Sequence, residues 1–230
     1  MTKIHDLINV KPESDFFFTA IDNAFTAIKS GEIIIAPAEN GYLYLVDAFN
    51  FNAIENLHNL INTPLTDLFQ VFLPRISTLS GVSSLNLGNT NTSKESSTNS
   101  AMNELLKKVW PGPLSLTIKT QPGLSWNLGI KSDLANVRVP NSNFLLKLLE
   151  RTGPLAVANT KIRNINKADS LKSLATEPVG QIFDFGIVPT FASTIIELVD
   201  FKTIRLLREG AISFAQIQAW SSDLAITIVP

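Results

Sequence analysis

The sequence predicts a single α/β domain, of the irregular kind also classed as α+β, and three observations support this prediction. The chain has 230 residues, which is enough for one large domain. Its content of 45% hydrophobic and 17% charged residues is typical of a globular protein with a buried core. Segments with helical spacing and short β-branched runs are mixed without strict alternation. This mixture favours a twisted, mixed sheet with flanking helices.

The helical segments are recognised by their apolar spacing and their end signals. In the first of them, apolar residues recur at helical intervals from Phe17 to Ile28, after Ser14 as N-cap and before Gly31 as a natural stop. The segments expected to be helical are 15–30, 51–61, 101–109, 142–152, 168–175 and 213–220.

The strands are predicted from short apolar or β-branched runs that turn residues bound. They are expected at 32–36, 42–48, 68–73, 114–119, 136–140, 155–157, 181–185, 193–199, 204–207 and 224–229. The run 76–100 is rich in Ser, Asn, Thr and Gly, so a long, mobile surface loop is expected there, either a lid or a solvated insertion.

The stretch from Trp110 to Ser115 joins a predicted helix to a predicted strand. Pro111 and Pro113 fix their own backbone and push their predecessors out of the helical region, and Gly112 lies between them. Ser115 is therefore presented at the mouth of a strand. Taken alone, such a turn favours a tight connection without any chemistry, because Pro/Gly turns are common and active sites are few.

Composition excludes several classes of function. The net charge is −1, so no overall positive field attracts nucleic acid. Cysteine is absent, which removes disulfides, thiolate nucleophiles and cysteine metal sites, and His5 and His58 lack a metal-ligand spacing. No signal peptide or membrane-length apolar run is visible. We therefore expect a soluble cytoplasmic protein with no membrane contact and no metal site.

Five segments resemble, in order, the motifs of one family. They are 108–115 (Lys-Val-Trp-Pro-Gly-Pro-Leu-Ser), 137–140 (Val-Arg-Val-Pro), 153–157 (Gly-Pro-Leu-Ala-Val), 193–198 (Ser-Thr-Ile-Ile-Glu-Leu) and 204–210 (Ile-Arg-Leu-Leu-Arg-Glu-Gly). The order and spacing are similar to those of the YrdC-like family, the L-threonylcarbamoyladenylate synthases, and the segment 124–129 resembles its actinobacterial members. The resemblance implies one domain over 1–230, with its core at about 15–220 and a wide concave groove.

The resemblance also implies a reaction. Threonine, bicarbonate and ATP give threonylcarbamoyl-AMP and pyrophosphate, and the product serves the threonylcarbamoyladenosine modification of tRNA. ATP would enter with Mg²⁺, and no tightly bound metal or organic cofactor is expected. The implied partners are these small molecules, together with tRNA or other tRNA-modification proteins.

Four residues match site positions of the family. Arg138 and Ser193 would hold the threonine end, and Ser115 and Arg208 would contact the nucleotide. The alternative interpretation is that the arginines form surface ion pairs and the serines satisfy the backbone.

Other positions depart from the family pattern. The threonines of P-T-x-T are replaced, with Glu39 bringing a negative charge, and K-x-R falls on Ile61-Asn62-Thr63. S-A-N falls on 159–161, and Lys161 and Arg163 are nearby cations that could compensate. Two hypotheses follow: a synthase with a rearranged site, or a catalytically defective paralogue that binds a nucleotide, double-stranded RNA or a protein. The near-neutral charge weakens the RNA hypothesis.

Overall fold

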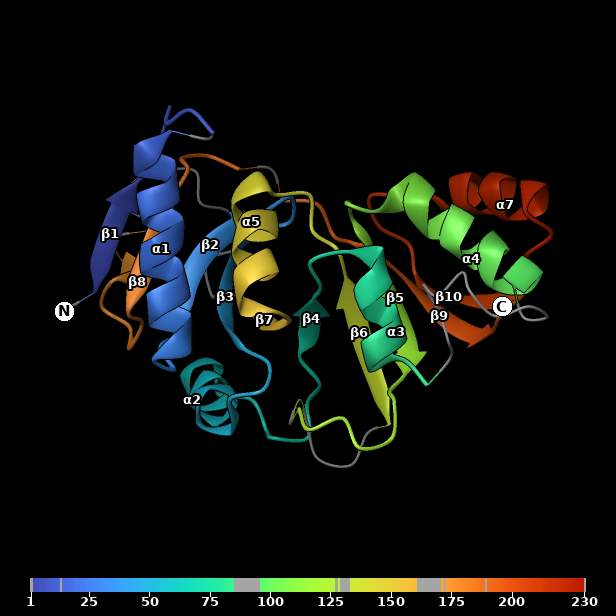
Figure 1. The fold of residues 1–230 in the computed structure, drawn as a ribbon, viewed down its shortest axis with the longest axis horizontal. Coiled ribbons are helices and arrows are strands. Elements are labelled where there is room, and N and C mark those ends of the chain that lie inside the picture. The colour runs from blue at the N-terminus through green and yellow to red at the C-terminus, as the bar shows by residue number, and fades with distance from the viewer. Residues whose placement is uncertain are drawn as a thin grey trace.

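One continuous sheet runs through the whole molecule (Figure 1). The structure is a computed structural model that describes residues 2–12, 14–84, 96–126, 128, 133–160, 171, 173–188 and 190–229. Within these residues the 11 strands follow the order β1-β8-β2-β3-β7-β4-β6-β5-β9-β10-β11. Neighbouring strands are parallel in some pairs, such as β4 with β6, and antiparallel in others, such as β2 with β3. The sheet is therefore mixed, as the sequence predicts.

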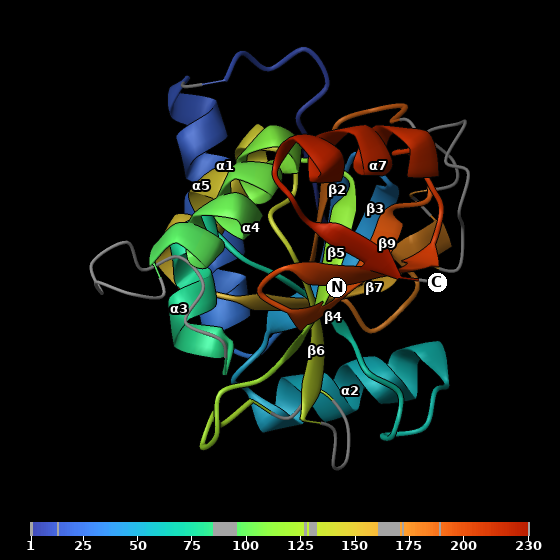
Figure 2. The same ribbon diagram turned by 90° about the vertical axis from the view of Figure 1, so that its right-hand side faces the viewer.

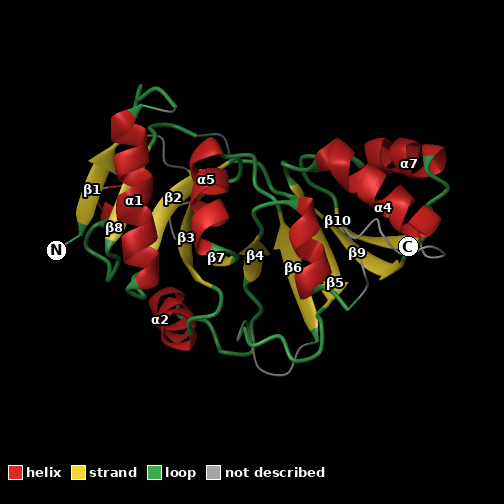
Figure 3. Ribbon diagram, viewed as in Figure 1, coloured by secondary structure: helices red, strands yellow, loops and turns green. Residues whose placement is uncertain are grey.

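The elements have the following bounds (Figure 3). The strands are β1 (Lys3–Asp6), β2 (Ile34–Ala38), β3 (Gly41–Asp47), β4 (Gln70–Phe72), β5 (Leu114–Lys119), β6 (Leu134–Arg138), β7 (Leu155–Asn159), β8 (Gln181–Asp184), β9 (Thr194–Asp200), β10 (Thr203–Arg208) and β11 (Thr227–Val229). The helices are α1 (Asp15–Lys29), α2 (Phe51–Ile61), α3 (Leu79–Val82), α4 (Ser96–Val109), α5 (Asn143–Thr152) and α7 (Phe214–Asp223), with a short 3₁₀ turn at Ile76–Thr78.

Side-chain caps start several helices where the sequence predicts them. Ser14 accepts a hydrogen bond from the Phe17 amide at α1, and Ser213 forms a full capping box with Gln216 at α7. These bonds satisfy amides that a helix start otherwise leaves without partners. The starts of α1 and α7 are therefore set by capping residues next to them in the sequence.

Helices α1, α5, α3 and α4 lie on one side of the sheet, whereas α2 lies below it (Figure 2). The side chains of β3 show how both faces of the sheet are packed, because successive side chains of a strand point to opposite faces. Leu43 and Leu45 pack with α1 and α5, while Tyr44 and Val46 join a second cluster with α2 residues such as Leu57. Side chains on both faces of β3 are thus buried.

The connection between α4 and β5 is held at several points. The peptide bond between Trp110 and Pro111 is cis. The Trp110 indole N–H donates to the Leu114 carbonyl at 2.7 Å, and the Gly112 amide donates to the Val139 carbonyl at 3.0 Å. A side chain on Gly112 would collide with the Val109 carbonyl. The turn predicted from the Pro-Gly-Pro run is present and fixed.

The structure differs from the sequence prediction at the ends and in the polar segment. Strand β1 pairs with β8, and β11 pairs with β10, so the sheet extends beyond the predicted core of 15–220. The strand Lys3–Asp6 was not predicted from the sequence, because only one of its four residues is buried. The predicted loop 76–100 is helical at 76–82 and from Ser96 onward, and 85–95 lie outside the described residues. None of the helices in the described part of the chain combines the length and apolar character that crossing a bilayer requires.

Candidate functional site

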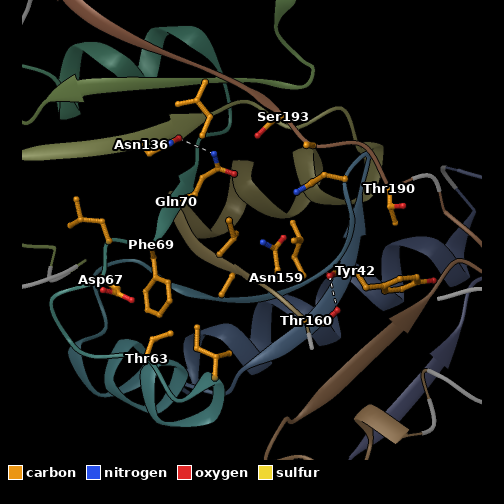
Figure 4. A pocket seen from close by; sticks show the side chains of 18 of the residues that line it. Tyr42, Thr63, Asp67, Phe69, Gln70, Asn136, Asn159, Thr160, Thr190 and Ser193 are labelled. Carbon is orange, nitrogen blue, oxygen red and sulfur yellow. Dashed lines mark hydrogen bonds between the residues drawn. The ribbon is translucent and has the colours of Figure 1, made fainter. Parts of the chain in front are cut away.

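A cavity of about 640 Å³ opens on the face of the sheet near its middle (Figure 4). Its walls come from the turn before β3, the end of α2, strands β4, β6 and β7, the segment that leads into β9, and the end of β10. The lining residues are Asn40, Tyr42, Leu43, Ile61, Thr63, Asp67, Leu68, Phe69, Gln70, Asn136, Val157, Ala158, Asn159, Thr160, Thr190, Phe191, Ala192, Ser193, Ile195 and Arg208.

Strand alternation supplies the polar floor of this cavity. In β5, Leu114 and Leu116 belong to the buried cluster that also contains Leu105 of α4. Ser115 lies between them and therefore points to the opposite face of the sheet. In β4, Gln70 likewise alternates with the buried Val71 and pairs in register with Asn136 of β6. Polar side chains from neighbouring strands therefore meet on one face.

A chain of hydrogen bonds links this floor to the cavity wall. The Gln70 amide nitrogen donates to Ser115 Oγ at 2.6 Å and to Asn136 Oδ1 at 2.8 Å. Ser115 Oγ donates to Ser193 Oγ at 3.1 Å. Arg208 Nη2 donates to the Ser193 carbonyl at 2.7 Å and to Ser193 Oγ at 3.1 Å. Three of the predicted site residues are thus joined, with Ser193 and Arg208 lining the cavity and Ser115 buried beneath them.

Close packing fixes the Ser193–Arg208 contact. Thr194 Oγ1 donates to the Ile212 carbonyl at 2.6 Å and accepts from its amide at 3.0 Å. A Cβ atom on Gly210 would lie 2.6 Å from the Ser193 carbonyl carbon. Glycine at 210 is therefore what allows the end of β10 to approach the start of β9.

Arg138, the fourth predicted site residue, is fully buried and does not line the cavity. Its guanidinium forms an ion pair with Glu39, donates to Asn40 Oδ1 at 3.4 Å and lies 5.3 Å from the centre of the Phe72 ring. Burial lowers the pKa of Arg138, and the Glu39 carboxylate opposes that change. The positive charge of Arg138 is thus balanced inside the protein.

The wall at the end of α2 carries the positions that resemble K-x-R. Ile61 and Thr63 both line the cavity, and Asn62 between them caps the helix in the left-handed conformation. Thr63 Oγ1 lies 3.1 Å from Nδ1 of the buried His58, whose ring packs 4.1 Å from that of Phe69. Where the family pattern has two cations, this wall has an isoleucine and a threonine.

The segment that resembles S-A-N forms another wall. Asn159 and Thr160 line the cavity, and Thr160 Oγ1 donates to the Tyr42 carbonyl at 3.0 Å. The Tyr42 hydroxyl donates to the Gly186 carbonyl at 2.8 Å, and burial raises its pKa. Lys161 and Arg163, the predicted compensating cations, lie outside the described residues.

Sequence reasoning missed several residues that line the cavity. Gln70, Asn136 and Phe191 have no counterpart among the motif residues, yet each borders the space. The available signal was a polar residue in each of two predicted strands, Gln70 within 68–73 and Asn136 at the start of 136–140. Across the described residues, histidine, aspartate and glutamate do not gather in the groups of three that would hold a metal ion.

Comparison with known proteins identifies the class that this fold and cavity represent. A model of the Sua5/YciO/YrdC family, described as telomere recombination, matches residues 26–210. The chain therefore belongs to this family, and it is a divergent member.

Relatives in the family carry the name of one enzyme. A Mycobacterium leprae protein, provisionally assigned as a threonylcarbamoyl-AMP synthase, is 28% identical over 201 residues, which are 86% of each chain. The threonylcarbamoyl-AMP synthase of Pyrococcus abyssi is 24% identical over 225 residues, 96% of this chain and 62% of that protein. The chain thus resembles a threonylcarbamoyl-AMP synthase, and it matches somewhat under two thirds of the archaeal protein.

Solved structures agree on the fold. Pyrococcus abyssi Sua5 complexed with L-threonine superimposes with a TM-score of 0.76 at 21% identity, over 100% of this chain and 63% of that one. Escherichia coli YciO superimposes with a TM-score of 0.71 at 20% identity, over 92% of this chain and 97% of that one. The α/β fold predicted from the sequence, in one YrdC-like unit, is confirmed.

Gly210→Ala tests the packing that positions Ser193. The added methyl group would overlap backbone atoms, so we expect a loss of about 1–3 kcal/mol in the free energy of unfolding. Chemical denaturation measures this loss. Gly81→Ala is the matched control, because no atom lies within 4 Å of its added methyl group. Equal stability of the two variants would contradict the close approach.

The two histidines predict how stability depends on pH. Burial lowers the pKa of His5 and of His58, so the folded chain binds fewer protons than the unfolded chain just below about pH 6.5. We therefore expect the free energy of unfolding to decrease as the pH falls from about 7.5 to 5.5. His58→Gln and His5→Gln should each remove part of that decrease, and an unchanged slope in the double variant would refute the assignment.

Proposed function

We propose that this chain is a threonylcarbamoyl-AMP synthase: it binds ATP, L-threonine and bicarbonate in the cavity and releases pyrophosphate. The observation that carries the proposal is the joined wall of Ser115, Ser193 and Arg208, which lines or underlies one cavity. The family membership and the names of the relatives point to the same reaction.

Arg208 would contact the phosphates of the nucleotide. Its guanidinium is held on two oxygens of Ser193, which are neutral groups, so its positive charge is not cancelled by them. A fixed guanidinium suits phosphate oxygens because it donates several hydrogen bonds in one plane. Ser193 would then offer its hydroxyl to the reacting amino acid.

Magnesium would arrive with ATP, whose triphosphate supplies most of the ligands that Mg²⁺ prefers. Asp67 is the carboxylate that lines the described cavity and could complete such a site. The ion offsets charge on the phosphate oxygens when bound. The protein's own residues hold and orient the two substrates.

The product would supply the modification of tRNA in the cytoplasm, with tRNA or other tRNA-modification proteins as partners. Support for this step comes from the family resemblance. The matched region is shorter than the archaeal relative, so the activity of that longer protein enters here as part of the proposal.

A second candidate is a binding module that keeps nucleotide recognition without synthesis. Ile61 and Thr63 stand where the family pattern has lysine and arginine, and Glu39 balances Arg138. Both features reduce the positive charge available to a triphosphate or a carboxylate. This candidate predicts that ATP binds but pyrophosphate is not released.

The synthesis assay separates the two candidates. With L-threonine, bicarbonate, ATP and Mg²⁺, we expect pyrophosphate release that depends on both threonine and bicarbonate, and threonylcarbamoyl-AMP detected by mass spectrometry. Arg208→Ala should lower the rate by about 100-fold, as expected for one preorganised charge. Arg205→Ala is the matched control, since Arg205 lies on the same strand and pairs with Glu197 at 3.0 Å. ATP binding without pyrophosphate would overturn the synthase proposal.

Phe191 predicts how the base is held. Its side chain is 58% exposed and lines the cavity, an arrangement that suits stacking on adenine. We expect Phe191→Ala to raise the Kd for ATP by about tenfold, measured by calorimetry. Ile187→Ala, a nearby exposed residue outside the cavity lining, should leave the Kd unchanged. Equal effects of the two variants would exclude stacking.

A further inference from the structure

Gln70 has no counterpart among the motif residues, yet it stands at the start of the chain of hydrogen bonds on the cavity floor. Its side-chain nitrogen donates to Ser115 Oγ at 2.6 Å and to Asn136 Oδ1 at 2.8 Å (Figure 4). A carboxamide nitrogen carries two hydrogens and accepts none. Both hydrogens of the Gln70 nitrogen are therefore used, and Ser115 can only receive a hydrogen from it.

Ser115 passes this direction on to Ser193. The Ser115 side chain is fully buried, and its hydroxyl has one hydrogen to donate. Because the Gln70 nitrogen cannot accept that hydrogen, it goes to Ser193 Oγ, which lies 3.1 Å away. The direction of the first bond thus sets the direction of the second.

Ser193 then has no accepting capacity left. A hydroxyl oxygen offers two lone pairs, and here one accepts from Ser115 and the other from Arg208 Nη2 at 3.1 Å. A guanidinium can only donate, so the direction of this last contact is fixed. The hydroxyl hydrogen of Ser193 finds no acceptor among the described residues, and Ser193 lines the cavity. What Ser193 still offers to a ligand is therefore a donor.

A second donor lies beside this hydrogen. Arg208 uses Nε and Nη2 on Ser193, whereas its Nη1 forms no hydrogen bond with the residues that the structure describes. Two neighbouring donors, one of them charged, suit an oxygen that carries negative charge and no hydrogen. Oxygens of a phosphate and of a carboxylate share this chemistry.

Building on the function proposed above, we propose that Gln70 is a positioning residue: it sets the direction of the chain and so makes Ser193 a donor to an anionic oxygen of the ligand. With an acceptor at position 70, Ser115 would turn its hydrogen toward that acceptor, and Ser193 would turn its own hydrogen toward Ser115. A lone pair of Ser193 would then face the ligand and repel an anionic oxygen.

The test compares Gln70→Glu with Asn136→Asp by calorimetry on the full chain, with ATP and Mg²⁺ as one ligand and L-threonine as the other. Gln70→Glu replaces the donor by an acceptor and reverses the chain. Asn136→Asp is the matched control, because it adds the same charge to the same floor while its carboxylate still accepts from Gln70. For the ligand whose oxygen meets Ser193, the Kd should rise about 30-fold in Gln70→Glu and about threefold in Asn136→Asp. A selective effect on ATP identifies a phosphate oxygen, and one on L-threonine identifies the carboxylate.

A Ser115→Ala background separates the chain from direct effects of charge and shape. Without the Ser115 hydroxyl, the direction cannot pass from residue 70 to Ser193, so Gln70→Glu and Asn136→Asp should weaken binding equally. Equal effects in the presence of Ser115 would overturn the role of Gln70. An excess effect of Gln70→Glu that persists in the Ser115→Ala background would overturn it as well.

Neutron diffraction from deuterium-exchanged crystals of the unmodified protein gives a readout that needs no ligand. We expect the deuterium of Ser115 on the line to Ser193 Oγ and the deuterium of Ser193 directed into the cavity. A Ser193 deuterium directed at Ser115 overturns the proposal. This measurement also decides the matter if Gln70→Glu fails to fold or if neither ligand binds, and the absence of binding contradicts the synthase proposal alone.

Discussion

The alternation of side chains along one continuous sheet is the constraint on which both the core and the cavity depend. In β5, Leu116 and Ile118 fill the core while Ser115 and Thr117 face the other side. A shift of one residue in register would exchange these two sets. The fixed turn from Trp110 to Leu114 and the pairing of β5 with β6 and β9 hold the register. The same alternation of side chains therefore produces both the packed core and the polar floor of the cavity.

The fold could be predicted from the sequence because its main signals are local. Apolar spacing, the cap at Ser14 and the Pro-Gly-Pro turn each fix a boundary, and the order of motifs pointed to the family. Strand β1 could not be predicted, because Lys3–Asp6 is short and mostly exposed and depends on distant β8 for its pairing. In the site, the link of Ser115 and Ser193 spans 78 residues, so local patterns gave no information on it. Gln70 was a polar residue inside a predicted strand, but its link to Ser115 spans 45 residues and could not be predicted either.

Two arginines of the same motif set have different electrostatic surroundings. Arg208 is bound to neutral oxygens of Ser193 at the edge of the cavity, and none of the described carboxylates forms an ion pair with it. Arg138 is buried against Glu39, so its charge is largely offset. A motif in a sequence gives the residue type but not the neighbour that balances it. The charge at this place in the structure therefore depends on the identity of residue 39 as much as on the presence of Arg138.

The turn between α4 and β5 has a mechanical consequence. Its indole and amide hydrogen bonds, and the tight fit at Gly112, leave it little freedom to bend. A connection of this kind passes a displacement on instead of absorbing it. A change in the packing at the end of α4 would therefore be expected to reach the start of β5, where Ser115 lies.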